Sequence, residues 1–217
     1  MMMNLFNIFD PSTTIMNMKL NWMSSLMIII LMPNFLWIMP NRINMIFTIM
    51  LNMLNKEMMM LYKSKKIKSP SFMFICLFIF ILLNNFISLF PYIFSSSSHM
   101  IFSMTMALPF WLFYIIFSTF NNTKNMISHL IPLNTPIYLA PFMTLIETMS
   151  IMIRPLSLSI RLTANLIAGH LLMTLLNFNS FMFIIIMIQM FMMMFEMCVA
   201  LIQSYVFSIL TSLYSSE

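Results

Sequence analysis

Charged side chains are scarce in this sequence: only 7% of its 217 residues are Asp, Glu, Lys or Arg, whereas 61% are hydrophobic. Soluble domains contain about 25% charged residues, so this chain has too few to cover a surface that faces water. The composition excludes a soluble protein and indicates an integral membrane protein. The two cysteines, Cys76 and Cys198, lie in apolar runs, and we interpret them as small core residues rather than a disulfide.

The few charges are also clustered. No Asp, Glu, Lys or Arg occurs in the 22 residues between Lys19 and Arg42, or in the 55 residues between Lys68 and Lys124. A membrane span needs about 20 apolar residues, so the first stretch fits one helix and the second fits two. Most of the positive charge lies in residues 42–68, and a short basic connection between spans marks the cytoplasmic-equivalent side of a membrane. The net charge of +5 therefore gives no reason to expect a nucleic-acid partner.

These patterns predict an all-α integral membrane protein with a single domain. In residues 42–62 polar groups recur at three- and four-residue spacing beside a basic flank, which favours a helix lying in the membrane interface. Two later segments would each be about twice as long as a bilayer core is thick if helical, so we expect a strongly tilted hairpin. The predicted elements are a span at 20–41, the interfacial helix 42–62, spans at 71–90 and 100–120 joined by a turn at 91–98, a polar connection over 121–136, and long helices at 137–176 and 180–214.

Arg161 lies inside one of these long apolar segments. Placing a guanidinium at mid-bilayer costs between about 2.5 and more than 10 kcal/mol, and this group does not lose its proton. Helical spacing gives Arg161 a face of polar or small residues. Close helix packing could explain the small residues of this face but not Arg161, which has no acid within one turn, so its partner is expected on another chain. The face comprises Glu147, Ser150, Arg154, Ser157, Arg161, Ala164, Asn165 and Ala168.

Two further polar groups stand out in the apolar C-terminal region. Glu196 and Gln203 are seven residues apart and share a helix face. A carboxyl group in such a segment suits reversible proton binding, although a hydrogen bond to a neighbouring helix, for example to His170, would also explain it. A His and a Glu on facing membrane helices favour a proton path. For Arg154, pairing with Glu147 or snorkelling to the interface is at least as plausible as a direct role in transport.

Enzymatic function is not indicated. The sequence has no Gly-rich phosphate loop and no Cys/His pattern with metal-ligand spacing, so we expect no catalytic residue, metal or cofactor. A secondary transporter or a subunit of a redox-driven pump would also hold buried charges, but it would predict repeated halves or paired broken helices, and no repeat is seen. A purely structural membrane subunit would leave the buried charges without a role.

The C-terminal motifs resemble a known family, subunit a of the rotary ATP synthase in its mitochondrial form. Residues 140–214 match it in order and spacing, and residues 1–120 match more loosely, through span order and Ala107 to Trp111. The matching motifs are Glu147-Thr148, Arg154-Pro155, Arg161 to Asn165, Ala168 to Leu172, Glu196, Val199 to Gln203, Tyr205 to Phe207 and Ser212 to Tyr214.

The resemblance implies a partner and a role for each site. Arg161 would face a ring of c subunits, each with a mid-membrane carboxylate, and would separate two proton half-channels. Pro155 would curve the helix round the ring, and Gly169 would permit a close backbone contact that tolerates no side chain. The implied proton-translocation residues are Arg161, Glu196, His170, Asn165, Gln203 and Glu147, with Arg154 and Ser157 as auxiliary residues.

The resemblance also implies a location. The chain would be a multi-pass protein of the mitochondrial inner membrane, in contact with lipid and with other membrane and peripheral-stalk subunits of the complex. The basic segment 42–68 would face the matrix, and the N-terminus would face the intermembrane space. ATP chemistry would belong to other subunits.

Overall fold

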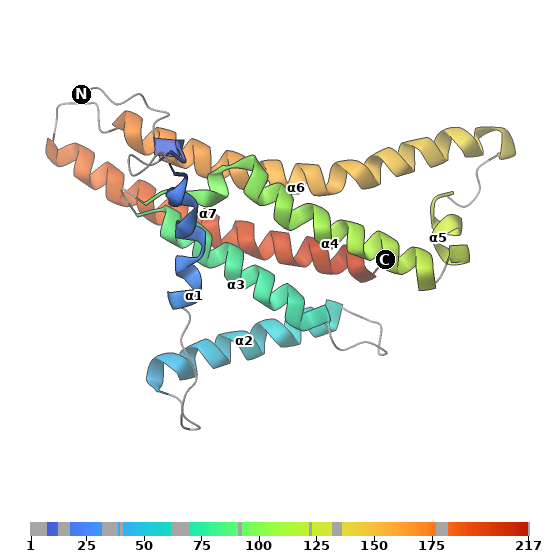
Figure 1. Ribbon diagram of the computed structural model, residues 1–217, viewed down its shortest axis with the longest axis horizontal. Helices are drawn as coiled ribbons and strands as arrows, with labels where there is room; N and C mark the ends of the chain where they lie inside the picture. The colour runs from blue at the N-terminus through green and yellow to red at the C-terminus, as the bar shows by residue number, and fades with distance from the viewer. Residues whose placement is uncertain are drawn as a thin grey trace.

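The protein is helical throughout the part that the computed structural model describes, which is residues 8–12, 18–31, 39, 41–61, 70–90, 93–121, 123–131, 136–176 and 182–216. No strand occurs in these ranges. Figure 1 shows the arrangement of the helices. In chain order they are the 3-10 helix η2 (Leu20–Ser25), α1 (Met27–Leu31), α2 (Arg42–Leu61), α3 (Pro70–Ser88), the 3-10 helix η3 (Ser96–Ser98), α4 (Met100–Asn121), α5 (Thr123–His129), the 3-10 helix η4 (Ile137–Leu139), α6 (Ala140–Leu176) and α7 (Met182–Ser216).

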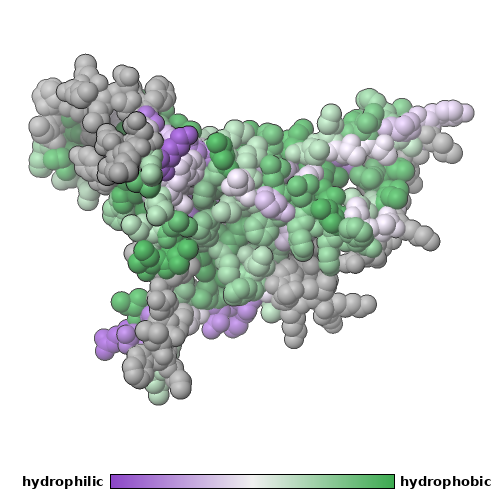
Figure 2. Space-filling view, viewed as in Figure 1, coloured by the Kyte–Doolittle hydropathy of each residue, from purple (hydrophilic) through white to green (hydrophobic). Residues whose placement is uncertain are grey.

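Four of the described helices are long and apolar enough to cross a membrane. They contain the segments Ser71–Ser88, Met100–Phe117, Ala140–Leu176 and Ile185–Leu213. The outer surface is dominated by hydrophobic side chains, and hydrophilic residues form only small groups on the face seen in Figure 2. A chain with this surface would not be stable in water. The protein is therefore an all-α membrane protein, as the sequence predicts.

The helix bounds follow the predicted segments closely over most of the chain. Two regions differ in detail: residues 20–31 form a 3-10 helix followed by a short α-helix, and the polar connection after α4 contains the short helix α5. The remainder of the predicted span 20–41 lies mostly outside the described residues, as does the basic stretch 62–69.

The long helices α6 and α7 run in opposite directions beside each other, with α4 packed on α6 and α3 packed on α7 (Figure 1). The centre of this arrangement is an apolar cluster contributed by all four helices. Leu162 of α6 and Phe207 of α7 are both only 1% exposed there. The buried members of the cluster are Leu77, Ile81, Ala107, Leu158, Leu162, Leu166 and Phe207.

Small side chains other than glycine line one buried face of α7. Ala200, Ser204, Ser208 and Ser212 recur every four residues along α7 and are all buried. Small side chains at this spacing let two membrane helices approach closely. Each of these serines donates its hydroxyl to a carbonyl three residues earlier in α7, at 2.8–2.9 Å. The hydroxyls are thus buried without an unpaired donor, which would be costly in an apolar region.

Helix α2 lies in the lower part of Figure 1 and packs on α3 and α7. One of its faces contributes Phe47, Leu51, Leu54 and Met58 to a second apolar cluster with α3. These residues recur at the three- and four-residue spacing of one helix face. The contact fixes α2 along one side of the bundle. The location of α2 in the membrane interface remains a prediction.

A proline interrupts the backbone hydrogen bonding of α6. Pro155 lies within the helix and is buried, and it has no N–H to donate. Figure 1 shows that α6 is curved along its length. A small cavity beside Pro155 is lined by Ala107, Trp111 and Tyr114 of α4, Leu158 of α6 and Thr211 of α7. The proline thus bends a continuous helix rather than ending it.

The interpretation of the cysteines as core residues is wrong. Cys76 and Cys198 are both free thiols, as expected, but both are exposed on the outside of their helices. An apolar run in a membrane protein is apolar on the lipid-facing side as well, so hydrophobic surroundings in the sequence do not indicate burial here.

Replacing Leu162 by Ala should destabilise the helix bundle. The cavity left at the centre of the apolar cluster should lower the free energy of unfolding by about 2 kcal/mol or more. Leu112→Ala is the matched control, because Leu112 is 48% exposed on α4, and its effect should stay below about 0.5 kcal/mol. Thermal unfolding of the purified complex in detergent measures both, and equal midpoints for the two variants would contradict the assigned core.

Candidate functional site

The two faces of α6 differ in composition. The buried face consists of Pro155, Leu158, Ser159, Leu162, Thr163, Leu166 and Met173. It packs on α4 and α7, so the opposite face points out of the chain. That outward face carries the predicted polar and small stripe, and five of its members are exposed: Ser157, Arg161, Ala164, Asn165 and Ala168.

Arg161 therefore projects from the outer surface of the bundle at the level of the apolar core. Leu162, the next residue, is among the most deeply buried side chains of α6. Among the described residues, none forms a hydrogen bond or ion pair with the Arg161 guanidinium, and the ion pair of α6 involves Arg154 instead. A permanent cation on an apolar outer surface is costly. The geometry agrees with the expectation that the partner of Arg161 is outside this chain.

One turn beyond Arg161, α6 and α7 are joined by a polar contact. Asn165 donates its side-chain amide to Oε1 of Gln203 at 3.1 Å. Gln203 is buried, with 7% of its surface exposed, so it needs such a partner. The contact brings together two residues that the sequence assigned separately, and it fixes the register of α7 against the helix that carries Arg161.

Glu196 lies against Gly169. A β-carbon added at position 169 would be only 2.9 Å from both Cδ and Oε1 of the Glu196 side chain. The absence of a side chain on Gly169 thus makes room for this carboxyl group. The expected close contact at Gly169 was with backbone, whereas the group that occupies the space is an ionisable side chain from α7.

His170 follows Gly169 in the sequence, and its ring contacts two other parts of the chain. The ring is packed edge-on to Phe9, with centroids 6.1 Å apart, and it lies against the backbone of Ser88 at the end of α3. Nε2 of His170 and Oε1 of Glu196 are both buried, and neither has a hydrogen-bond partner in the described structure. The structure therefore has no hydrogen bond between these two atoms of Glu196 and His170, in contrast to the alternative that the sequence left open.

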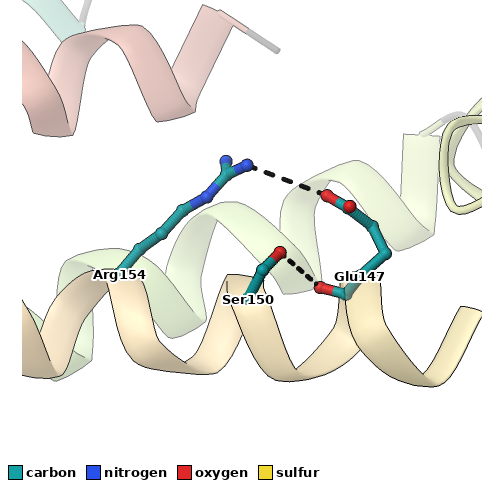
Figure 3. A network of polar contacts seen from close by, with 3 residues as sticks. All are labelled: Glu147, Ser150 and Arg154. Carbon is teal, nitrogen blue, oxygen red and sulfur yellow. Dashed lines mark hydrogen bonds and ion pairs between the residues drawn. The ribbon is translucent and has the colours of Figure 1, made fainter. Parts of the chain in front are cut away.

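A second charged group lies nearer the start of α6. Nη2 of Arg154 is 3.8 Å from Oε1 of Glu147, and Figure 3 shows the two side chains pointing toward each other along one side of the helix. Ser150, between them, donates its hydroxyl to the backbone carbonyl of Glu147 at 2.8 Å. The ion pair that the sequence suggested for Arg154 is present. Both partners are about one-third exposed, so the pair stabilises the fold only weakly.

Sequence reasoning missed a polar link between α7 and α2. The hydroxyl of Tyr205 donates to Oε2 of Glu57 at 3.2 Å, which joins α7 to α2. The two residues are 148 positions apart, and no local pattern relates them. The only available signal was that Glu57 is the single acid of the basic segment 42–68.

The fold and the site define a polytopic helical membrane protein with an outward cation on one helix and a buried carboxyl group on the next. The family described as "ATP synthase A chain" matches residues 18–216. The chain is 78% identical to ATP synthase F(0) complex subunit a of Rhopalosiphum padi, over 99% of both chains. It is 46% identical to ATP synthase subunit a of Aedes aegypti, over 100% of this chain and 99% of the relative, and equally identical to that of Drosophila melanogaster at the same coverage.

The chain belongs to the ATP synthase subunit a family. It is thus a multi-pass subunit of the membrane sector of ATP synthase, the sector that translocates protons, and it is not an enzyme on its own because the ATP chemistry resides elsewhere in the complex.

Substituting Gly169 by Ala should displace the Glu196 carboxyl group without preventing assembly. The new methyl group would meet the flexible end of a side chain, so Glu196 can move, and alanine is the better helix former by about 1 kcal/mol. We expect proton flux through the reconstituted complex to fall while its thermal stability is unchanged or higher. Leu112→Ala, at an exposed residue of α4 away from this contact, serves as the control. Lower stability with normal flux would show that the glycine serves packing alone.

Proposed function

We propose that this chain is the stator subunit that couples proton flow to rotation of a c-subunit ring in the mitochondrial inner membrane. Family membership supports the general role, and the position of Arg161 supports the specific one. Its guanidinium lies on an outward face of α6, in an apolar part of the bundle. No acid of the described residues forms an ion pair with it. A mid-membrane carboxylate on a neighbouring subunit is the chemical group that would satisfy it.

A fixed cation at this position has two effects on a passing carboxyl group. It favours the ionised form, so a protonated ring site that approaches Arg161 releases its proton toward the outlet. The same charge repels protons and prevents them from crossing directly between the two half-channels. Once reprotonated, the ring site is neutral and can turn through lipid, where a bare carboxylate would be too costly.

The inlet half-channel in this proposal runs through Glu196 and His170. The supporting observation is that each has a buried polar atom with no partner among the described residues. Glu196 lies against Gly169, and His170 is the next residue of α6. Such atoms bind water or exchange protons readily. From Glu196, the route to the ring passes the Asn165–Gln203 contact, which stands one turn from Arg161.

The outlet half-channel runs along the first half of α6, past Glu147. Its carboxyl group is held on one side of the helix by Arg154 at 3.8 Å and is partly exposed. It can therefore accept a proton released near Arg161 and pass it to water. Arg154 acts here as a positioning residue, and Ser157, exposed between Arg154 and Arg161, provides a hydroxyl along the route.

The proposed orientation places the basic segment 42–68 on the matrix side and the N-terminus in the intermembrane space. The positive charge of that segment supports it. With α3 starting on the matrix side, the α3–α4 turn lies on the intermembrane-space side. Each proton that crosses would release about 2.3 kcal/mol per 100 mV of membrane potential, so several protons are needed for each ATP made.

Replacing Arg161 by Gln should abolish ATP synthesis driven by a proton gradient, while the complex still assembles. Glutamine removes the charge that releases protons from the ring site and keeps the half-channels apart. Vesicles containing the complex measure synthesis, and native electrophoresis measures assembly. Arg42→Gln, the same change at an exposed residue outside the proposed path, should leave synthesis normal. Coupled synthesis in the Arg161→Gln complex would refute the proposal.

Replacing Glu196 by Gln should slow proton uptake rather than stop it. Water and His170 would still carry part of the path, so we expect about a tenfold slower flux, equivalent to a barrier about 1.4 kcal/mol higher. Glu57→Gln is the control, since that acid lies on α2 outside the inlet and can still accept the Tyr205 hydrogen bond. Wild-type flux in the Glu196→Gln complex would remove Glu196 from the inlet.

A further inference from the structure

The first part of the chain lies on the bundle without joining its core. We call residues 8–12 and 18–25 the N-terminal strap, and Figure 1 shows them in blue, near the point where α6 ends and α7 begins. The strap contributes no residue to either apolar cluster, and η2 has no buried residue. An element with so little buried apolar surface opens at a low free energy. The strap is therefore attached to the bundle by a few contacts only.

One of these contacts covers the place where Glu196 lies against Gly169. We call Glu196, Gly169 and His170 together the Glu196 site. The Phe9 ring is packed edge-on against the His170 ring, with centroids 6.1 Å apart and planes at 82°. Nε2 of His170 and Oε1 of Glu196 are buried without a partner among the described residues. A phenyl ring has no polar group to offer them, so Phe9 covers the Glu196 site without bonding to it.

A second contact fixes the other end of the strap to the α3–α4 turn. The Trp22 ring lies over the rings of His99 and Phe94, with centroids 5.2 and 5.7 Å away. Ser24 donates its hydroxyl to the backbone carbonyl of Phe94 at 3.1 Å. The turn itself is enclosed, because Ser95 to Ser98 are between 0% and 4% exposed and pack against α3, α4 and α6. The strap thus rests on a surface that belongs to the packed bundle.

The two ends of the strap are bonded to each other. Asn21, beside Trp22, donates its side-chain amide to the backbone carbonyl of Asp10, beside Phe9, at 3.3 Å. The backbone N–H of Ser12 donates to Oδ1 of Asp10 at 3.1 Å. Both hydrogen bonds are exposed, so water competes for them and they hold the strap weakly. The rings of Phe9 and Trp22 therefore belong to one linked unit that can leave the bundle together.

The outer side of the strap is polar, in contrast to the rings on its inner side. Asp10 and Lys19 are the charged residues of the strap, and both are exposed. Charged side chains are costly in the hydrocarbon part of a membrane, so the outer side of the strap is suited to face water. The strap therefore stands between an aqueous surface and the ionisable groups of the Glu196 site. A weakly attached segment in this position has the geometry of a lid.

We propose that the N-terminal strap is a lid on the Glu196 site, closed in this structure, which opens when Phe9 and Trp22 leave the two histidine rings. The closed lid keeps solutes larger than water away from the Glu196 carboxyl group, and the open lid exposes the site to the solution on the side of the N-terminus. The inference rests on the proposed function, which gives the Glu196 site its role in proton uptake. It adds control of access by a segment that contributes nothing to the apolar core.

Thiol labelling tests whether the strap controls access. Ser88→Cys, in a Cys76→Ser and Cys198→Ser background, places a thiol beside His170, because Ser88 is 1% exposed and its backbone lies against that ring. A membrane-impermeant methanethiosulfonate is added to the complex in vesicles, on the side of the N-terminus. Adding Phe9→Ala should make the labelling at least about tenfold faster, because the lid is then open more of the time.

Ile8→Ala is the matched control for Phe9→Ala, since Ile8 is the preceding residue and is 40% exposed. It should leave the labelling rate of Ser88→Cys unchanged. A second cysteine separates lid opening from general loosening: Ser208→Cys, 0% exposed and bonded within α7, should be labelled equally slowly with Phe or Ala at position 9. Unchanged labelling of Ser88→Cys in the Phe9→Ala complex, or equal acceleration at both cysteines, would overturn the inference.

Hydrogen–deuterium exchange of the unmodified complex tests the opening if a variant does not assemble. Backbone amides of the strap should exchange at least about tenfold faster than those of residues 157–168 in α6, because local opening exposes them. Strap amides that exchange as slowly as those of α6 would overturn the inference. The Arg161→Gln experiment decides the proposed function separately, since labelling does not depend on coupling. Loss of coupling in that variant, with labelling that Phe9→Ala leaves unchanged, would reject the lid alone.

Discussion

A permanent cation in an apolar setting is the constraint on which the rest of the structure depends. The guanidinium of Arg161 cannot lose its proton, and the described chain offers it no acid. The opposite face of α6, which includes Leu158 and Leu162, is locked into the apolar centre of the bundle. Helix packing therefore fixes the direction of Arg161 outward. We propose that a second protein compensates this charge.

Buried polar groups of two kinds occur in this protein: those that support helix packing and those on the proposed proton route. Where helices only need to approach closely, as along Ser204 and Ser208, each hydroxyl is bonded within its own helix and acts as a small side chain. Where the proposed proton route runs, polar atoms are buried without a partner in the part of the chain that the structure describes, as on His170 and Glu196. Buried polar groups thus serve two purposes, and the hydrogen-bond partner of each group distinguishes them.

The sequence predicted the helices well because long apolar runs and isolated charges depend little on tertiary structure. It placed Arg161, and the pairing of Arg154 with Glu147, because helical spacing relates residues a few turns apart. It could not predict that Ser95 to Ser98 are buried, since three helices from different parts of the chain enclose them. Nor could it predict that Cys76 is exposed, because lipid-facing and buried residues are equally apolar in a membrane helix.

The most direct test of the central claim asks which subunit faces Arg161 in the assembled complex. Ala164 lies one turn from Arg161 on the same exposed face, so a cysteine there would sit at the proposed contact. Oxidative crosslinking of Ala164→Cys to a cysteine placed beside the ring carboxylate of the c subunit should give a crosslinked a–c product. Leu112→Cys, exposed on α4, should give none. Absence of that product, with crosslinks from Ala164→Cys only to other subunits, would contradict the account.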